Sequence, residues 1–151
     1  MLKINRQTDY AVRVLLALAR QGEGARVCSS EIQQQMLIPP ALMPRIVARL
    51  ARTGLLNTFP GREGGLMLPR PASELTLRDV VEAFEGPILL SECLQDKGED
   101  DCPFQSNCPV RSKWGRVQVA MLREMAAITF ESLAQEAPGT PVEILSPGLA
   151  Y

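Results

Sequence analysis

The sequence has 151 residues, of which 46% are hydrophobic, a formal net charge of −1 and no histidine. Its length is that of one ordinary domain with a hydrophobic core, and because it lacks a run of about 18 apolar residues it contains no transmembrane helix. The first nine residues lack the apolar core of a secretory signal, and four cysteines without such a signal indicate reduced thiols, so we expect a cytoplasmic protein.

The charge is divided unevenly along the chain. Residues 1–70 contain ten Lys or Arg and four Asp or Glu, a formal charge of +6, whereas residues 71–151 contain six basic and thirteen acidic residues, a formal charge of −7. A basic half joined to an acidic half indicates a nucleic-acid-binding face on one part of the molecule. A chance asymmetry of the surface would give the same totals, so charge alone leaves both interpretations open.

The basic half begins with two predicted helices. Apolar residues at helical spacing predict a first helix over residues 8–21, capped by Thr8 or Asp9 and ended by the glycines at 22 and 24. A second, short helix is predicted from residues 28–31 to residue 36, with a serine accepting the free amide hydrogens of its first turn. Cys28 is expected to be a small buried residue, and a metal ligand is the alternative.

A third helix is predicted after the connection at residues 37–40, and it ends before Gly54. Apolar residues form one of its faces, and Arg45, Arg49 and Arg52, spaced four and three apart, align along another. Arginines on the second helix of a tight pair suit docking in the DNA major groove, because they neutralise phosphates and donate to base edges. Taken alone, the arginines fit a solvated helix face better.

Two short strands are predicted next. Residues 55–59 and 66–68 are apolar strand candidates, joined by a glycine-rich turn at residues 60–65 that carries Arg62. A helix pair followed by a strand, a basic turn and a strand is the order of a winged helix, in which the turn reaches phosphate or the minor groove. An ordinary surface hairpin would have the same glycines, but together with the basic half the order favours DNA binding.

The acidic half is predicted to hold a short helix and a long one. The short helix covers residues 76–86, with Thr76 and Asp79 forming its capping pair. The long helix runs from Pro109 to about Glu136, on the order of 40 Å at 1.5 Å per residue. A helix this long with an apolar stripe suits packing against a second copy, so we expect a homodimer; a helix lying across its own core is the alternative. The stripe consists of Val110, Trp114, Val117, Met121, Met125 and Ile128.

Three cysteines lie in the acidic loop between these helices: Cys93, Cys102 and Cys108, at the spacing Cys-x8-Cys-x5-Cys. Three thiols so close together do not fit a simple disulfide framework and indicate ligands of a metal or an iron–sulfur cluster. Structural zinc usually has paired Cys-x2-Cys knuckles, which this spacing lacks. A metal-free thiol–disulfide switch remains open. We expect no enzyme, because there is no histidine base to activate a thiol and no obvious phosphate-binding glycine loop.

The chain resembles one bacterial family over residues 1–136. The resemblance rests on Thr8–Arg13, on Ile38–Leu50 with its arginines, on the wing Gly61–Gly65 and on the three cysteines. This is the winged-helix iron–sulfur regulator family that includes the cluster-assembly regulator IscR, the nitric-oxide-sensing repressor NsrR and the iron-responsive repressor RirA. The resemblance implies a mainly α fold with a small β wing and a homodimer that binds palindromic double-stranded DNA. It also implies a cluster that senses nitric oxide, redox state or iron and controls operator affinity.

The resemblance further implies the ligands and the DNA contacts. The cluster-assembly regulator uses a histidine after the third cysteine, which this chain lacks, whereas the nitric-oxide sensor uses an aspartate near the start of the first helix, donated by the other subunit. Asp9 occupies that position, so a 4Fe-4S cluster is expected ahead of a 2Fe-2S cluster, held by Asp9 and the three cysteines; a helix-capping role for Asp9 is the alternative. The arginine that often precedes the first wing glycine is replaced by Pro60, and Arg62 is expected to take over its contact. The expected DNA contacts are Ser29, Ser30, Pro40, Ala41, Arg45, Arg49, Arg52 and Arg62.

These expectations divide the chain into four parts. We expect a winged helix-turn-helix domain at residues 1–86, a cluster-binding loop at 87–108, a dimerisation helix at 109–136 and an irregular tail at 137–151. With the cluster bound, the loop and the long helix would be ordered and the two recognition helices held at a spacing that fits DNA. Loss of the cluster would relax this geometry and lower operator affinity.

Overall fold

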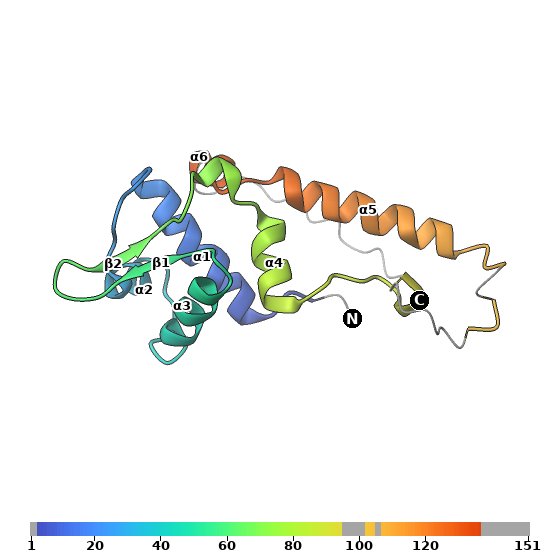
Figure 1. Cartoon of the computed structure of the whole chain (residues 1–151), viewed down its shortest axis with the longest axis horizontal. Helices are drawn as coiled ribbons and strands as arrows, with labels where there is room; N and C mark the ends of the chain where they lie inside the picture. Colours follow the sequence, from blue (N-terminus) through green and yellow to red (C-terminus); the bar gives the residue numbers. More distant parts are fainter. Residues whose placement is uncertain (1–2, 95–101, 105–106, 137–151) are drawn as a thin grey trace, which may run out of the picture.

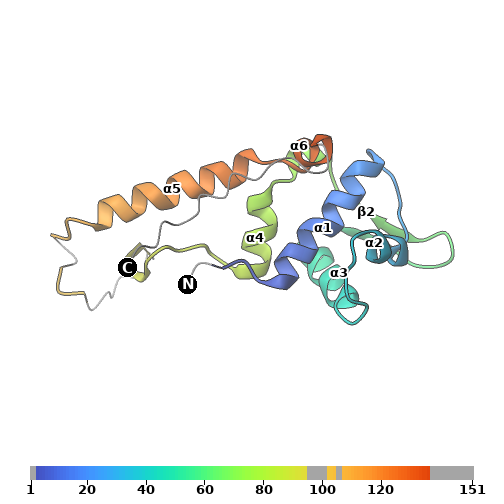
Figure 2. The ribbon, with the colours of Figure 1, turned by 180° about the vertical axis from the view of Figure 1, so that it is seen from behind.

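The computed structural model describes residues 3–94, 102–104 and 107–136, and it is mainly helical with one small sheet (Figure 1). Helices α1 to α4, α6 and the sheet gather at one end, whereas α5 projects away from them as an arm (Figures 1 and 2). This arrangement confirms the predicted winged helix-turn-helix fold, while the predicted irregular tail lies outside the described residues. The helices and strands are α1 (Arg6–Gln21), α2 (Ser29–Gln35), α3 (Met43–Arg52), β1 (Asn57–Phe59), β2 (Gly65–Met67), α4 (Leu77–Glu85), α5 (Arg111–Ala127) and α6 (Phe130–Gln135), with short 3-10 turns η1 (Ala72–Glu74) and η2 (Glu92–Leu94).

Helix α1 begins earlier than predicted, because its cap is Asn5. The Asn5 side chain accepts a hydrogen bond of 3.0 Å from the Thr8 amide, so the predicted caps Thr8 and Asp9 are both wrong. Thr8 is instead fully buried, and its hydroxyl donates a hydrogen bond to the carboxylate of Glu85, the last residue of α4. The start of the first helix is thereby tied to the end of α4.

Helices α2 and α3 form the predicted pair beside α1. Cys28 precedes α2, makes no side-chain capping bond and is exposed, so the predicted serine cap and the predicted burial of Cys28 are both wrong. The turn between the two helices holds Leu37 at a φ of 52°, a left-handed conformation uncommon for residues other than glycine, with its side chain 81% exposed. Pro44 lies in the first turn of α3, where a missing amide hydrogen leaves no gap in the helix.

Strands β1 and β2 form the predicted wing, with Thr58 opposite Leu66 in antiparallel register. Each strand has three residues and β1 starts later than expected, because Leu55 and Leu56 are buried in the core before pairing begins. Val27 pairs with Leu66 on the other side of β2 through backbone hydrogen bonds of 2.8 and 3.0 Å. The segment that leads into α2 therefore adds one isolated β-bridge to the two-stranded wing.

Helix α4 has the predicted capping pair. The Thr76 hydroxyl accepts a hydrogen bond from the Asp79 amide, and the Asp79 carboxylate accepts one from the Thr76 amide. This reciprocal capping fixes the start of α4. Among the described residues, no helix combines the length and apolarity needed to cross a membrane.

The single helix expected over residues 109–136 is instead two helices, α5 and α6. Ile128 is extended, and the Thr129 side chain caps α6 by accepting a hydrogen bond of 3.1 Å from the Ser132 amide. Backbone hydrogen bonds of 2.9 Å join residues 128 and 130 to residues 77 and 75 and hold α6 beside the start of α4. With 17 residues, α5 spans about 25 Å, well short of the expected length.

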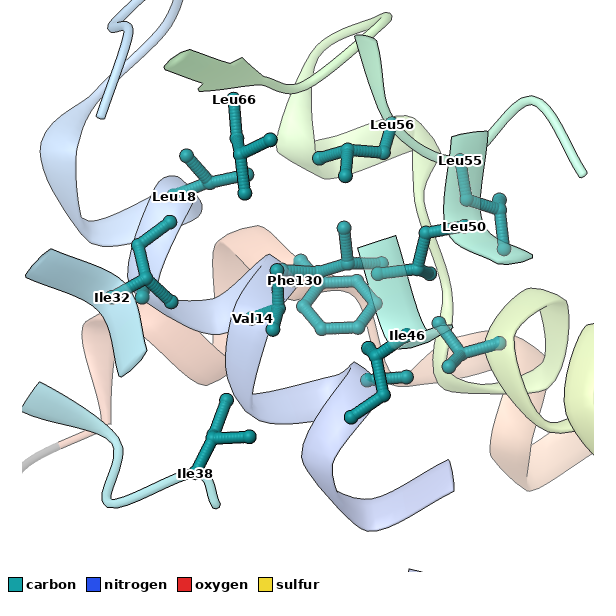
Figure 3. Packing of buried hydrophobic residues seen from close by; sticks show 14 of the residues in the cluster. Val14, Leu18, Ile32, Ile38, Ile46, Leu50, Leu55, Leu56, Leu66 and Phe130 are labelled. Atoms are coloured by element: carbon teal, nitrogen blue, oxygen red, sulfur yellow. The ribbon is translucent and has the colours of Figure 1, made fainter. Parts of the chain in front are cut away.

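The reason for the break is the core of the winged-helix end. Phe130 of α6 is fully buried and lies among Val14 of α1 and Ile46 and Leu50 of α3 (Figure 3). Burying such a ring contributes more than continuing the helix into solvent would, since a phenylalanine removed from water contributes roughly 1.5–3 kcal/mol. The segment after α5 thus returns to complete the core around α1.

Candidate functional site

The expected DNA contacts lie at the end of the molecule opposite α5. They belong to the start of α2, the connection to α3, α3 itself and the wing, which lie at the same end in both views (Figures 1 and 2). A winged helix presents its recognition helix and its wing to one duplex from such an end. The exposed members of the set are Ser29, Ser30, Pro40, Ala41, Arg45, Arg52 and Arg62.

Three arginines of this surface are not neutralised by an acidic side chain in the described residues. Within the described part of the chain, Arg45, Arg52 and Arg62 take part in no salt bridge. When exposed guanidinium groups contact DNA phosphates, they displace the counterions condensed on the DNA. This release of counterions is a main source of affinity for DNA. The arrangement is therefore chemically suited to a nucleic-acid backbone.

Arg49 differs from the other arginines of α3, because its side chain is engaged within the subunit. Its Nε donates a hydrogen bond of 3.1 Å to the Ala83 carbonyl, and its guanidinium carbon lies 4.8 Å from the centre of the Phe84 ring. Both partners belong to α4, so in this structure the Arg49 side chain is directed at α4, and its expected contact with DNA stays a prediction. Arg49 joins the recognition helix to α4.

The turn of the wing is compact because of its glycines. The Gly64 amide donates a hydrogen bond of 3.1 Å to the Gly61 carbonyl and closes the turn. A side chain at Gly64 would collide with the Phe59 carbonyl oxygen and lie 2.8 Å from carbonyl atoms of Pro60. A larger residue there would open the turn and displace Arg62 at its tip.

The cysteine loop is attached to α5 at its first part. The Leu90 amide donates a hydrogen bond of 3.1 Å to the Gln118 side chain. A methyl group built on Gly115 would lie 3.8 Å from the Leu94 side chain, so η2 packs closely on α5. Cys93 lies in η2, half-buried, with its sulfur 3.2 Å from the Ser91 hydroxyl.

The remaining cysteines and the expected fourth ligand do not form one group with Cys93. Cys102 is exposed and Cys108 is half-buried shortly before α5, and all three thiols are free. Within residues 3–94, 102–104 and 107–136, no group of three or more His, Cys, Asp or Glu is close enough to hold a metal ion. As a donor set, three reduced thiols on one loop fit an iron–sulfur cluster, but this geometry would require the loop to close around it.

Asp9 lies on α1 in an open hollow. The hollow is lined by residues 3–6 together with Asp9 and Arg13. The Asp9 carboxylate pairs with Arg13 at 2.9 Å, one turn further along the helix, and both side chains are about two-fifths exposed. Surface pairs of this kind contribute only about 0–1 kcal/mol, so a competing ligand could displace Arg13.

The apolar stripe of α5 is exposed in its first half and faces α4 in its second half. Trp114 is 47% exposed and Val117 is 52% exposed, which is unusual for large apolar side chains. Further along, Met121 and Met125 line a hollow together with Val81 of α4 and the segment after it. The stripe is therefore covered by its own subunit only in its second half.

Two further side chains, Cys28 and Arg26, lie in the segment that leads into α2. Hydrogen bonds from the Ser30 hydroxyl and amide lower the pKa of the exposed Cys28 thiol. The Arg26 guanidinium lies 3.9 Å from the centre of the Phe59 ring. Both residues lie close to Ser29 in the sequence, which could have indicated that they belong to the same surface. The contact of Arg26 with Phe59 depends on strand pairing, which residue spacing in the sequence does not reveal.

Comparison with known proteins gives a consistent result. The Rrf2 family, described as an iron-dependent transcriptional regulator, matches residues 4–136. The chain is 35% identical to Protein aau3 of Rhizobium meliloti over 91% of this chain and 88% of that protein. It is 28% identical to the HTH-type transcriptional regulator NsrR of Oceanobacillus iheyensis, over 87% of this chain and 89% of that one. Among solved structures it is similar to CymR, the global cysteine regulator of B. subtilis, with a TM-score of 0.71 and 27% identity over 89% of this chain and 97% of that chain.

Proposed function

The chain belongs to the Rrf2 family of transcriptional regulators, and from that premise we propose that it is a repressor whose affinity for DNA is controlled by an iron–sulfur cluster on its cysteine loop. The observation that carries DNA binding is the gathering of free, exposed arginines of α3 and the wing at one end of the molecule. Arg45, near the start of α3, would read bases, and Arg52 and Arg62 would contact phosphates. A repressor bound to DNA would act in the cytoplasm.

The cluster proposal rests on the donor set. Cys93, Cys102 and Cys108 would hold the cluster, and Asp9 of a second copy would complete the ligands of a 4Fe-4S form, after releasing Arg13. Support comes from three free thiols on one loop, from an exposed carboxylate in an open hollow and from the iron dependence named in the family description. When bound, the cluster would react with nitric oxide or oxygen, or would be lost when iron is scarce. The protein without a cluster lacks this chemistry.

The homodimer proposal rests on α5. Trp114 and Val117 leave a stripe exposed that a second copy of α5 would cover. Two recognition helices related by a twofold axis would then meet two half-sites of a palindromic operator. The same pairing would bring Asp9 of one subunit near the cysteine loop of the other.

The chain's own contacts suggest how the loop would influence the DNA surface. The loop is attached to α5 through Leu90 and Gln118, α5 packs on α4, and α4 holds α3 through Arg49. Closing or opening the loop would shift α5 and, through α4, bias the position of the recognition helix. In this proposal Arg49 couples the two ends of the subunit and does not contact DNA.

A metal-free thiol switch is the second candidate. It is favoured by the likeness to the cysteine regulator CymR, and by the exposed Cys28 thiol whose pKa is lowered beside the DNA surface. In this alternative, cysteines would form disulfides or adducts that change the same dimer. Anaerobic purification separates the two candidates, since only a cluster protein contains iron and acid-labile sulfide.

The experiment compares the Cys102→Ala and Cys28→Ala variants with the wild-type chain. For a cluster protein, anaerobic wild-type material is coloured and contains iron, Cys102→Ala is colourless, and Cys28→Ala keeps its colour. A mobility-shift assay with promoter fragments, with and without the cluster, then measures its effect on DNA binding. Colourless, iron-free wild-type protein that still binds DNA would refute the cluster and leave the thiol switch.

A further inference from the structure

The wing itself carries no net charge. Residues 57–67 include one arginine and one glutamate, Arg62 and Glu63, next to each other in the turn, so their formal charges cancel. A surface that binds the DNA backbone needs an excess of cations. The structure adds one from outside the hairpin, in the segment that leads into α2.

This cation is Arg26, on the outer face of the sheet. Leu66 and its partner Val27 are buried, so the residues next to them along the strands point to the opposite, outer face. There the Arg26 guanidinium carbon lies 3.9 Å from the centre of the Phe59 ring, a close cation–π contact. The two backbone hydrogen bonds of Val27 fix the position from which Arg26 extends.

Gly65 makes this contact possible. It is the partner of Phe59 across the hairpin, so the space beside the ring holds no side chain. Its φ is 143°, and a Cβ atom there would lie 2.8 Å from the Val27 carbonyl oxygen, which would push the segment that carries Arg26 away from the wing. The close approach of three chain segments therefore depends on one glycine.

We propose that Arg26 is a phosphate-binding residue of the wing, positioned by the ring of Phe59. The inference rests on the proposed DNA-binding function and adds a residue to it. Arg26 is exposed and makes no salt bridge among the described residues, so its charge is available. It comes three residues before Ser29, the first residue of α2, so its backbone belongs to the segment between α1 and α2 that runs beside the wing. Stacking uses one face of the guanidinium and leaves its N–H groups free to donate to phosphate oxygens.

The test measures binding of the full chain to a fluorescent mixed-sequence duplex of about 30 base pairs over a range of salt concentrations. Arg26→Ala is expected to reduce the slope of log K against log salt by about 0.9 per bound subunit, and to weaken binding about eightfold per subunit at about 0.1 M salt. Phe59→Leu keeps the charge but loses the ring, so binding weakens while the slope stays. Arg123→Ala, an exposed arginine on α5, is the matched control and leaves both quantities unchanged.

Arg45→Ala separates this inference from the proposed function. If Arg45→Ala lowers affinity and slope whereas Arg26→Ala matches the wild type, the inference about Arg26 is overturned and DNA binding stands. If neither variant changes the slope, the proposed DNA surface is wrong and the inference falls with it. Thermal melting of each variant verifies folding, and Arg26→Gln replaces Arg26→Ala should the alanine variant fail to fold.

Discussion

Replacing Arg49 with alanine separates stability from DNA binding on the same helix. The change removes a hydrogen bond of 3.1 Å to the Ala83 carbonyl and a cation–π contact at 4.8 Å to Phe84. A charged donor to a half-buried carbonyl contributes about 1.5 kcal/mol and an exposed cation–π contact about 0.5–1 kcal/mol, so the free energy of unfolding should fall by about 2 kcal/mol. For a chain of this size such a loss lowers the melting temperature by about 4–8 °C.

The DNA measurement on the same variant is expected to differ from that of Arg45→Ala. Arg49 contacts α4, so its removal should leave the salt dependence of binding to a mixed-sequence duplex unchanged, whereas Arg45→Ala should lower the slope by about 0.9 per subunit. Urea unfolding followed by circular dichroism gives the stability, and fluorescence anisotropy gives the slope. An Arg49→Ala protein with wild-type stability and a lowered slope would show that Arg49 contacts phosphate after all, and would remove it from the coupling route.

Three further predictions concern the core, the N-terminal tie and the arm. Phe130→Ala should lower the free energy of unfolding by about 3–5 kcal/mol in urea titrations, because the ring fills the core, whereas a wild-type midpoint would mean that α6 is not docked there. Hydrogen bonds from the Thr8 hydroxyl and the Asn5 amide lower the pKa of Glu85, so its stabilising contribution is present at neutral pH and is lost as the pH falls through the folded-state pKa. Thr8→Val should therefore lower stability at neutral pH and flatten its acid dependence, and parallel pH profiles for the two proteins would contradict this role. Trp114→Ser should shift the sedimentation coefficient from dimer to monomer with little change in subunit unfolding, since the side chain is 47% exposed in one subunit; an unshifted dimer would place the interface elsewhere.

The sequence predicted those elements whose signals are local. The capping pair of Thr76 and Asp79 and the glycine-rich turn of the wing are encoded within a few residues, and both are present. The break at Ile128 was missed because apolar residues continue at helical spacing up to this position. The helix ends there because Phe130 is buried in a core formed by residues far away in the sequence. Asn5 was missed as a cap because residues 6 and 7 were not expected to be helical.

The sequence indicated which residues belong to the candidate site, but not the direction in which their side chains point. Helical spacing places Arg45, Arg49 and Arg52 along one side, yet the ring of Phe84 and the Ala83 carbonyl draw Arg49 to α4. Cys28 was expected in the core, but the buried position falls on Val27, which pairs with β2 and leaves the next side chain exposed. In both cases a tertiary contact decides the direction of a side chain, and a single sequence does not contain that contact.

The part of α5 that the cysteine loop contacts is also the part that is free to bind a second copy. Gly115 packs against η2, and Gln118 accepts the hydrogen bond from Leu90. The exposed Trp114 and Val117 precede these two residues directly in the sequence. Met121, by contrast, lines a hollow together with the segment after α4. An ordered loop would therefore stiffen the exposed first half of the arm, where the partner would pack, while its second half stays fixed to the winged-helix end. Because the proposed dimer would set the spacing of two recognition helices, a change confined to this loop would alter DNA affinity without touching a DNA contact.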